Sequence, residues 1–149
     1  MKQIVVKIAE NRKVASGFYR MRVESPYLAK NTAPGQFFKI RCHDADDPLL
    51  RRPLGAHRIL KNGVEMLYEV IGKGTELLSR RRAGEYLDII GPLGNGFNLS
   101  RKTINDKRKT ILIAGGIGVA PLMALAEELC RGKGQACLPE IGRQAVRQG

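Results

Sequence analysis

The sequence predicts a mainly β fold, in which a six-stranded antiparallel barrel is followed by the beginning of a parallel α/β domain. Three observations lead to this prediction. Short segments that alternate apolar and polar residues, separated by turn residues, fill residues 1–100 of the 149. A single apolar segment, 110–114, then enters a glycine-rich turn and a stretch of helical periodicity. No second strand follows this unit, so the α/β domain is expected to be incomplete.

The six barrel strands are expected where the alternation is clearest, and the turn residues between them support the assignment. Pro34-Gly35 marks one turn, and Asn62-Gly63 favours a tight hairpin. One helix is expected among the strands, capped by Thr75, running from Glu76 to about Arg82 and ended by Gly84. The expected strands are 4–8, 19–23, 38–40, 58–60, 64–70 and 86–90.

The second part of the chain begins with a strand at 110–114, apolar enough for burial on both faces. A helix follows, in which Pro121 is tolerated in the first turn and Glu127 and Glu128 are expected on the outer side. We therefore divide the chain into a barrel (1–100), a linker (101–110), the start of a nucleotide-binding α/β domain (111–130) and an atypical tail (131–149). Our hypothesis is that this tail results from truncation or a frame shift.

The net charge of +12 favours anionic partners, and its distribution distinguishes among them. The basic residues occur in small groups without interleaved aromatic residues, so a solvated surface is a better interpretation than a nucleic-acid site. A non-catalytic basic barrel that binds nucleic acid remains the alternative from another functional class. No apolar run approaches the roughly 20 residues of a membrane span, and no signal peptide is apparent, which predicts a cytoplasmic protein.

Three segments have the composition of phosphate-binding turns. Arg52-Pro53-Leu54-Gly55 offers a guanidinium beside a rigid turn, and Gly72-Lys73-Gly74-Thr75 begins the expected helix. The glycines of 115–118 separate the apolar strand from its helix. Taken alone, the first segment is better interpreted as a surface arginine before a turn, and the second as a plain helix cap. Together in one barrel, they favour a dinucleotide such as FAD.

These motifs, in their order and spacing, resemble the ferredoxin-reductase-type flavoproteins, and within them the electron transfer subunits of dihydroorotate dehydrogenase B. The resemblance covers about residues 2–130, and 91–97 is its most specific segment. It implies an FAD-binding barrel, an NAD-binding α/β domain and a [2Fe–2S] centre held by C-terminal cysteines. It also implies a hetero-oligomer in which electrons pass between NAD(H) and an FMN-containing catalytic subunit in pyrimidine biosynthesis. Other ferredoxin–NADP-reductase-like electron-transfer subunits remain an alternative. The motifs are Pro34-Gly35-Gln36-Phe37, Arg51-Arg52-Pro53-Leu54, Gly72-Lys73-Gly74-Thr75, Gly91-Pro92-Leu93-Gly94-Asn95-Gly96-Phe97 and Gly115-Gly116-Ile117-Gly118-Val119-Ala120-Pro121.

The resemblance also implies the cofactor-binding residues. Gly55 departs from the family, in which a serine commonly stands at this position beside the flavin. Cys130 and Cys137 do not reproduce the four-cysteine spacing of a [2Fe–2S] site, so no metal ligands are expected on this chain. No catalytic residue is assigned. The implied FAD contacts are Arg52, Pro53, Leu54, Gly55, Leu67, Tyr68, Glu69, Gly74 and Thr75, and the implied nicotinamide-nucleotide turn contains Gly115, Gly116 and Gly118.

Overall fold

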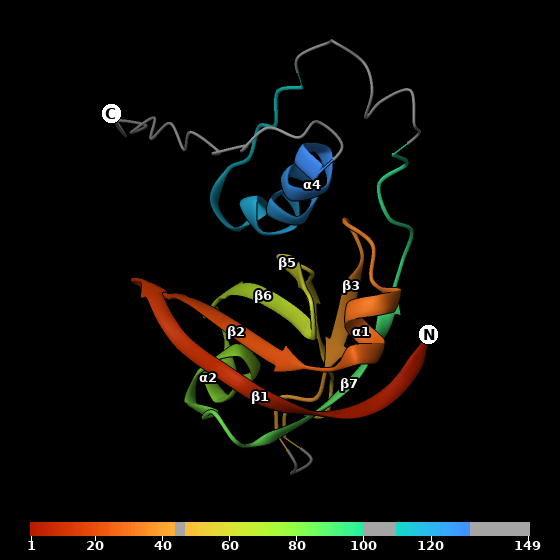
Figure 1. Cartoon of the computed structure of the whole chain (residues 1–149). Coiled ribbons are helices and arrows are strands. Elements are labelled where there is room, and N and C mark those ends of the chain that lie inside the picture. Colours follow the sequence, from red (N-terminus) through yellow and green to blue (C-terminus); the bar gives the residue numbers. More distant parts are fainter. Residues whose placement is uncertain (44–46, 100–109, 132–149) are drawn as a thin grey trace, which may run out of the picture.

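The computed structural model describes residues 1–43, 47–99 and 110–131, and it consists mainly of one curled antiparallel sheet (Figure 1). The sheet has seven strands in the order β4-β3-β7-β1-β2-β6-β5, and each pairing is antiparallel. This confirms the mainly β class and the antiparallel barrel. The strands are β1 Lys2–Ala15, β2 Phe18–Glu24, β3 Phe37–Ile40, β4 Arg52–Gly55, β5 Arg58–Leu60, β6 Gly63–Glu69 and β7 Tyr86–Leu93.

The curl of the sheet encloses one hydrophobic core. Inward-facing residues alternate along each strand, as Val6 and Ile8 do on β1 and Met21 and Val23 do on β2. Phe38, on β3, is fully buried among them. This period of two is the pattern that the sequence displays, which explains why most of the strands could be predicted from it.

β4, at one end of the strand order, does not pair with β6, the last strand but one at the other end. β4 and β6 approach each other across the curled sheet, but the only sheet partners they have in the described structure are β3 for β4 and β2 and β5 for β6. We call this opening between β4 and β6 the seam. The outer edge of β4, and the edge of β6 beyond Glu65 where its pairing with β5 ends, leave polar backbone groups available to a ligand.

Two short helices flank the sheet. α1 (Pro26–Asn31), which the sequence analysis missed, is capped by Ser25, whose hydroxyl accepts a hydrogen bond of 3.2 Å from the backbone N–H of Leu28. α2 is Lys73–Arg80, so it starts and ends earlier than predicted. Thr75 is therefore not the cap but the third residue of the helix. Gly84, with φ +94°, belongs instead to the turn before β7.

Two predictions about strands were wrong. The barrel has a seventh strand, β4, where a turn was expected, because Arg52–Gly55 pairs with all of β3. The expected strand at 110–114 does not form, and Ile111 and Ile113 are 81% and 87% exposed. A strand is stable only with neighbours, and no described segment pairs with these residues.

The chain then forms a short 3-10 helix, η1 (Gly116–Val119), and α4 (Ala120–Arg131). α4 was predicted, and Figure 1 shows it over the end of the barrel formed by β5 and β6. The prediction that Glu127 lies on the outer side was wrong, because it pairs with Arg58 of β5. Residues 44–46, most of the expected linker (101–110) and most of the expected tail (131–149) lie outside the described residues.

Candidate functional site

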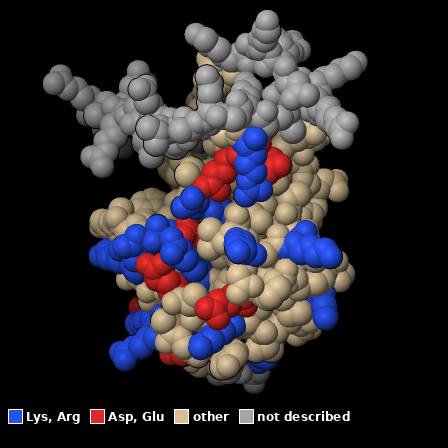
Figure 2. All heavy atoms as spheres, in the orientation of Figure 1, with Lys and Arg blue, Asp and Glu red and all other residues tan. Residues whose placement is uncertain are grey.

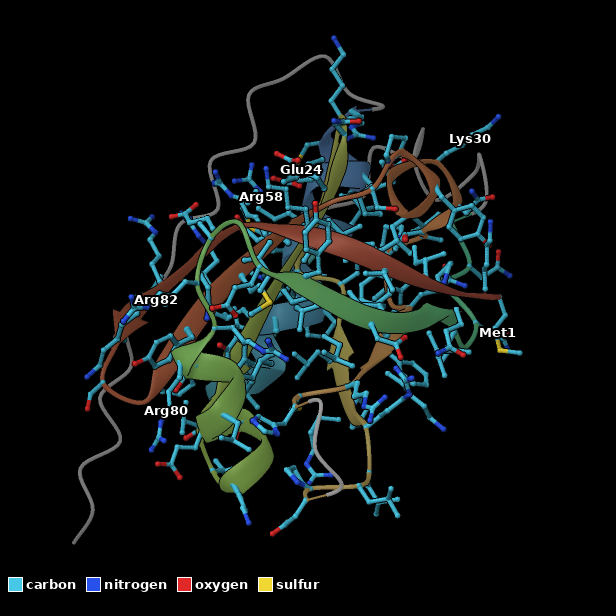
Figure 3. The ribbon with its side chains drawn as sticks, turned by 90° about the horizontal axis from the view of Figure 1, so that it is seen from below. Met1, Glu24, Lys30, Arg58, Arg80 and Arg82 are labelled. Carbon is cyan, nitrogen blue, oxygen red and sulfur yellow. The ribbon has the colours of Figure 1, made fainter. Side chains whose placement is uncertain are left out.

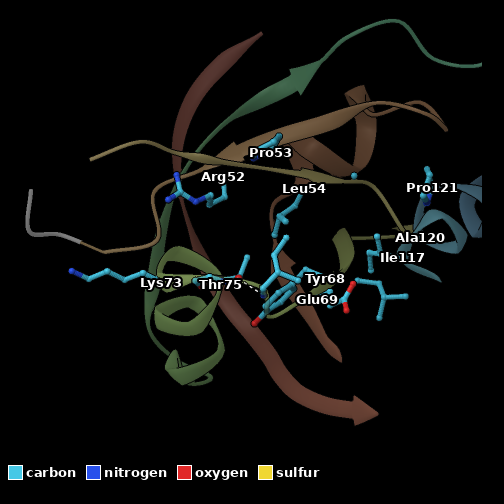
Figure 4. Close-up of a pocket in the computed structure, with 14 residues that line it drawn as sticks. Arg52, Pro53, Leu54, Tyr68, Glu69, Lys73, Thr75, Ile117, Ala120 and Pro121 are labelled. Carbon is cyan, nitrogen blue, oxygen red and sulfur yellow. Dashed lines mark hydrogen bonds between the residues drawn. The ribbon is translucent and has the colours of Figure 1, made fainter. Parts of the chain in front are cut away.

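A cavity of about 470 Å³ occupies the seam and extends to the start of α4 (Figure 4). Its volume lies within the range of small-molecule sites. The wall comes from four places in the sequence: β4, the end of β6, the start of α2, and the η1–α4 junction. The lining residues are Arg52, Pro53, Leu54, Gly55, Leu67, Tyr68, Glu69, Ile71, Gly72, Lys73, Thr75, Ile117, Ala120 and Pro121.

One end of the cavity is basic. The side chain of Arg52 lies against Gly74, so closely that a methyl group at Gly74 would come within 2.7 Å of Arg52 Nε. Arg52 also donates a 2.8 Å hydrogen bond from Nη1 to the carbonyl of Leu50. Lys73 stands at the same end and pairs with the carboxylate of Asp47. The structure thus brings together the two turns that the sequence suggested as phosphate-binding.

α2 begins at Lys73, at this basic end, and the first backbone N–H groups of a helix have no partner within the helix. The hydroxyl of Thr75 holds the preceding turn in place. It accepts hydrogen bonds from the N–H groups of Ile71 (3.1 Å) and Gly72 (3.3 Å) and donates to the carbonyl of Gly72 (3.0 Å). Because its proton is used within the turn, Thr75 shapes the helix start through its side chain, and its backbone N–H is the group left for a ligand.

The middle of the cavity is apolar and is lined by Pro53, Leu54, Leu67 and Tyr68. Tyr68 is only 1% exposed and is both a core residue and part of the cavity wall. Its hydroxyl donates a 3.0 Å hydrogen bond to Asn11 Oδ1, and its ring stacks on Tyr19 with centroids 5.9 Å apart. Burial raises the pKa of Tyr68, because the apolar surroundings disfavour the charged phenolate.

Two consecutive residues, His57 and Arg58, attach the far wall of the cavity to the barrel. His57 precedes β5, and its Nδ1 lies 2.8 Å from the carbonyl oxygen of Ala120, so Nδ1 carries the proton. Arg58 contacts Glu127 Oε1 at 2.6 Å through both Nε and Nη2. These contacts set α4 and Pro121 opposite Gly55. Sequence reasoning gave His57 no role, and nothing in its spacing would have identified its partner.

Most of the residues predicted to contact the cofactor line the cavity. Gly74 lies behind Arg52 rather than in the wall. Gly115, Gly116 and Gly118 lie outside the wall, although Ile117 between them is part of it. At Gly55, a side chain would meet only Pro121 Cβ at 3.9 Å, so the residue leaves open space. The predicted residues that line the cavity are Arg52, Pro53, Leu54, Gly55, Leu67, Tyr68, Glu69 and Thr75.

Two other motifs contact each other away from the cavity. Phe97 donates a backbone hydrogen bond of 2.8 Å to the carbonyl of Pro34, and Gln36 Nε2 donates to the carbonyl of Gly94 at 2.8 Å. Gly35 has φ +92° and packs within 3 Å of the Phe97 ring at the position of a missing Cβ. Segment 91–97, the most specific part of the family resemblance, therefore has a structural role: it packs against residues 34–36.

Much of the positive charge is matched by acidic residues. Arg20 and Arg22 contact both Glu10 and the buried Glu65, and hydrogen bonding to Glu65 raises the pKa of Arg22. Figure 2 shows acidic side chains among the basic ones on the face in view. Such mixing weakens the field that nucleic acid would need. None of the helices in the described segments is long and apolar enough to span a membrane.

The chain is similar in sequence to curated electron transfer subunits from several bacteria. The chain is 42% identical over 124 residues to the dihydroorotate dehydrogenase B (NAD(+)) electron transfer subunit of Desulforamulus reducens, covering 82% of this chain and 46% of that protein. It is 39% identical over 146 residues to the corresponding subunit of a Geobacillus species, covering 97% and 56%. No protein-family model matches the chain.

Solved structures agree on the fold. An NADH-dependent reduced ferredoxin–NADP oxidoreductase matches with a TM-score of 0.67 and 27% identity, over 87% of this chain and 45% of that one. Phthalate dioxygenase reductase matches with a TM-score of 0.69 and 18% identity, over 88% and 40%. The chain spans about half the length of the curated relatives it matches. It is thus a relative of the dihydroorotate dehydrogenase B electron transfer subunits, built on a ferredoxin-reductase-type barrel.

Proposed function

We propose that this chain binds FAD in the seam and is the flavin-binding part of an electron transfer subunit of the dihydroorotate dehydrogenase B type. The observation that supports this most strongly is the meeting of Arg52 and the start of α2 at one end of a cavity whose middle is apolar. FAD needs both kinds of surface, because its diphosphate is anionic and the faces of its flavin ring are apolar.

The residues present fit the cofactor. Arg52 and the first backbone N–H groups of α2 would hold the diphosphate, since a guanidinium and a helix N-terminus both favour anionic oxygen. Leu54, Leu67 and Tyr68 would cover the ring and exclude water from it. Bound FAD would supply the hydride and single-electron chemistry, and the protein groups would orient it.

The remaining steps of the role are also proposals. Nicotinamide nucleotide would approach from the side of Gly115, Gly116 and Gly118, where Ile117 and Pro121 border the cavity. Electrons would pass between NAD(H) and an FMN-containing catalytic partner subunit, through a [2Fe–2S] centre that the described residues do not ligate. The names of the relatives, which refer to dihydroorotate dehydrogenase, support including a role in pyrimidine biosynthesis in this proposal.

Titration with FAD tests the proposal through Arg52. Arg52→Ala removes the guanidinium from the basic end of the cavity, so we expect the Kd for FAD to rise about tenfold or more, since charge-assisted contacts contribute about 1.5–3 kcal/mol. The matched control is Arg80→Ala, which removes the same charge from the exposed C-terminal end of α2 (Figure 3). It should leave the Kd within about twofold. Equal losses in both variants, or no FAD uptake by the unmodified chain, would contradict the proposed site.

A further inference from the structure

Glu69 is an acidic residue in a cavity that is otherwise basic or apolar. It is the last residue of β6, is half-buried, and lines the cavity together with Leu67. In Figure 4 it lies beside Tyr68 on the side of Ile117 and Ala120, whereas Arg52 and Lys73 are on the other side. The cavity therefore has a positive end and a negative end.

The carboxylate of Glu69 is unpaired within the described part of the chain, and this is unusual in a protein with a net charge of +12. The other described acidic residues form an ion pair, with the single exception of Glu24 at the exposed end of β2. Even the neighbouring carboxylate on the same face of β6, Glu65, is held by Arg20 and Arg22. Glu69 is thus the only unpaired described carboxylate that faces the cavity.

An unpaired charge at such a place acts on whatever occupies the cavity. Its interaction is stronger than in water because the surrounding wall is apolar and partly excludes solvent. A diphosphate is attracted to the end with Arg52 and repelled by the end with Glu69, so it would lie at the basic end. With the flavin ring in the apolar middle of the cavity, against Leu67 and Tyr68 as proposed above, the ring is the part of the cofactor nearer to Glu69.

We propose that Glu69 is a potential-setting residue, whose carboxylate lowers the reduction potential of the flavin held in the seam. This inference rests on the proposed function. Full reduction adds two electrons to the ring, supplied by NADH as a hydride, so the reduced ring is more negative than the oxidised one. A fixed negative charge nearby destabilises the reduced form more than the oxidised form and so lowers the potential.

The test is the midpoint potential of bound FAD, measured by spectroelectrochemical titration. Glu69→Gln keeps the size of the side chain and removes its charge, so we expect the potential to rise. At the midpoint of the unmodified protein, the ratio of reduced to oxidised flavin in the variant should be about three- to tenfold higher. Tenfold corresponds to about 30 mV for a two-electron couple.

Two further variants make the result specific. Glu69→Asp retains the charge and should stay close to the potential of the unmodified protein. Glu24→Gln removes an equally unpaired charge at the other end of the β2–β6 pairing, where Glu24 is opposite Gly63, and should also leave the potential unchanged. An unchanged potential in Glu69→Gln, with FAD still bound, overturns this inference and leaves the proposed function intact. Failure of the unmodified chain to bind FAD overturns both.

Discussion

Asp88 on β7 fixes the loop before β4 to the sheet. Its Oδ2 accepts a 2.5 Å hydrogen bond from Arg51 Nη2, and Arg51 Nη1 also donates to the backbone carbonyl of Asp88 at 3.0 Å. Gln3 on β1 adds a hydrogen bond of 3.0 Å to the same oxygen. The side chain of Arg51 is thereby committed to β7, while that of Arg52, the next residue, reaches the cavity.

This ion pair predicts a specific pH dependence of stability. The hydrogen bond from Arg51 lowers the pKa of Asp88 below its ordinary value. The contribution to stability is therefore fully present above the unfolded-state pKa of about 3.9, and it is lost as the pH falls through the lower folded-state pKa. Asp88→Asn should reduce the free energy of unfolding by about 1 kcal/mol at pH 7.

Urea unfolding at a series of pH values measures this effect. The difference between Asp88→Asn and the unmodified protein should shrink as the pH falls below about 3.9. Glu24→Gln, which breaks no ion pair in the described structure, provides the control and should show no such trend. A difference that stays constant down to pH 2 would mean that Asp88 is not stabilised in its charged form.

Residue-level predictions from the sequence succeeded where a motif could be matched. They failed where the direction in which a side chain points had to be known. The motif at 51–54 was found, but its letters do not tell that Arg51 and Arg52 point to different partners. That division depends on where β4 begins, because Arg51 lies in the preceding loop and Arg52 is the first residue of the strand. Glu127 shows the same limit, because its pairing with Arg58 is decided by how α4 packs on β5.

Among the elements, the β5–β6 hairpin depends on a glycine for a reason other than turn geometry. Leu60 pairs with Gly63, so the two-residue loop consists of Lys61 and Asn62, and Gly63 is the first residue of β6. Its φ is not positive. A Cβ at Gly63 would instead lie 1.9 Å from the carbonyl oxygen of Val23 on β2, so the glycine permits close contact between β6 and β2.

Gly63→Ala should therefore destabilise the fold strongly. The clash is with backbone atoms of an interior strand, which cannot move as a flexible side chain can, so we expect a loss of more than about 2 kcal/mol in the free energy of unfolding. Gly115→Ala is the control: its φ is −116° and its Cβ would meet nothing within 4 Å. Denaturant unfolding that ranks the two variants equally would refute the close approach.

Strand prediction succeeded where a period of two could be recognised or where turn residues marked the end of a short strand, as at β3 and β5. Five-residue alternations on β2 and β7 gave the right elements. β4 has four residues, one of them proline, and α1 has six, so neither carries a readable period. The segment 110–114 has a strand-like composition, but composition cannot provide the neighbouring strand that a sheet requires.

At the scale of the whole molecule, the seam is the consequence of a sheet that curls without closing. β4 and β6 lie at separate points of the strand order, and the cavity forms where they approach without pairing. α2 and the η1–α4 junction complete its wall, held by Arg52 on one side and by His57 and Arg58 on the other. The sequence predicted the two turns of this site, at 52–55 and 72–75. It did not predict the seam between them, because the position of the seam depends on the order of the strands in the sheet.

Hydrogen–deuterium exchange of the chain with and without saturating FAD tests the central claim most directly. The account predicts slower exchange with FAD in three separate segments, 52–55, 67–69 and 73–75, because a ligand in the seam would contact or shield their backbone N–H groups. The β1–β2 hairpin tip around Gly17 should exchange at the same rate in both samples. Protection at that tip with none in the three segments, or no change anywhere, would contradict FAD binding in the seam.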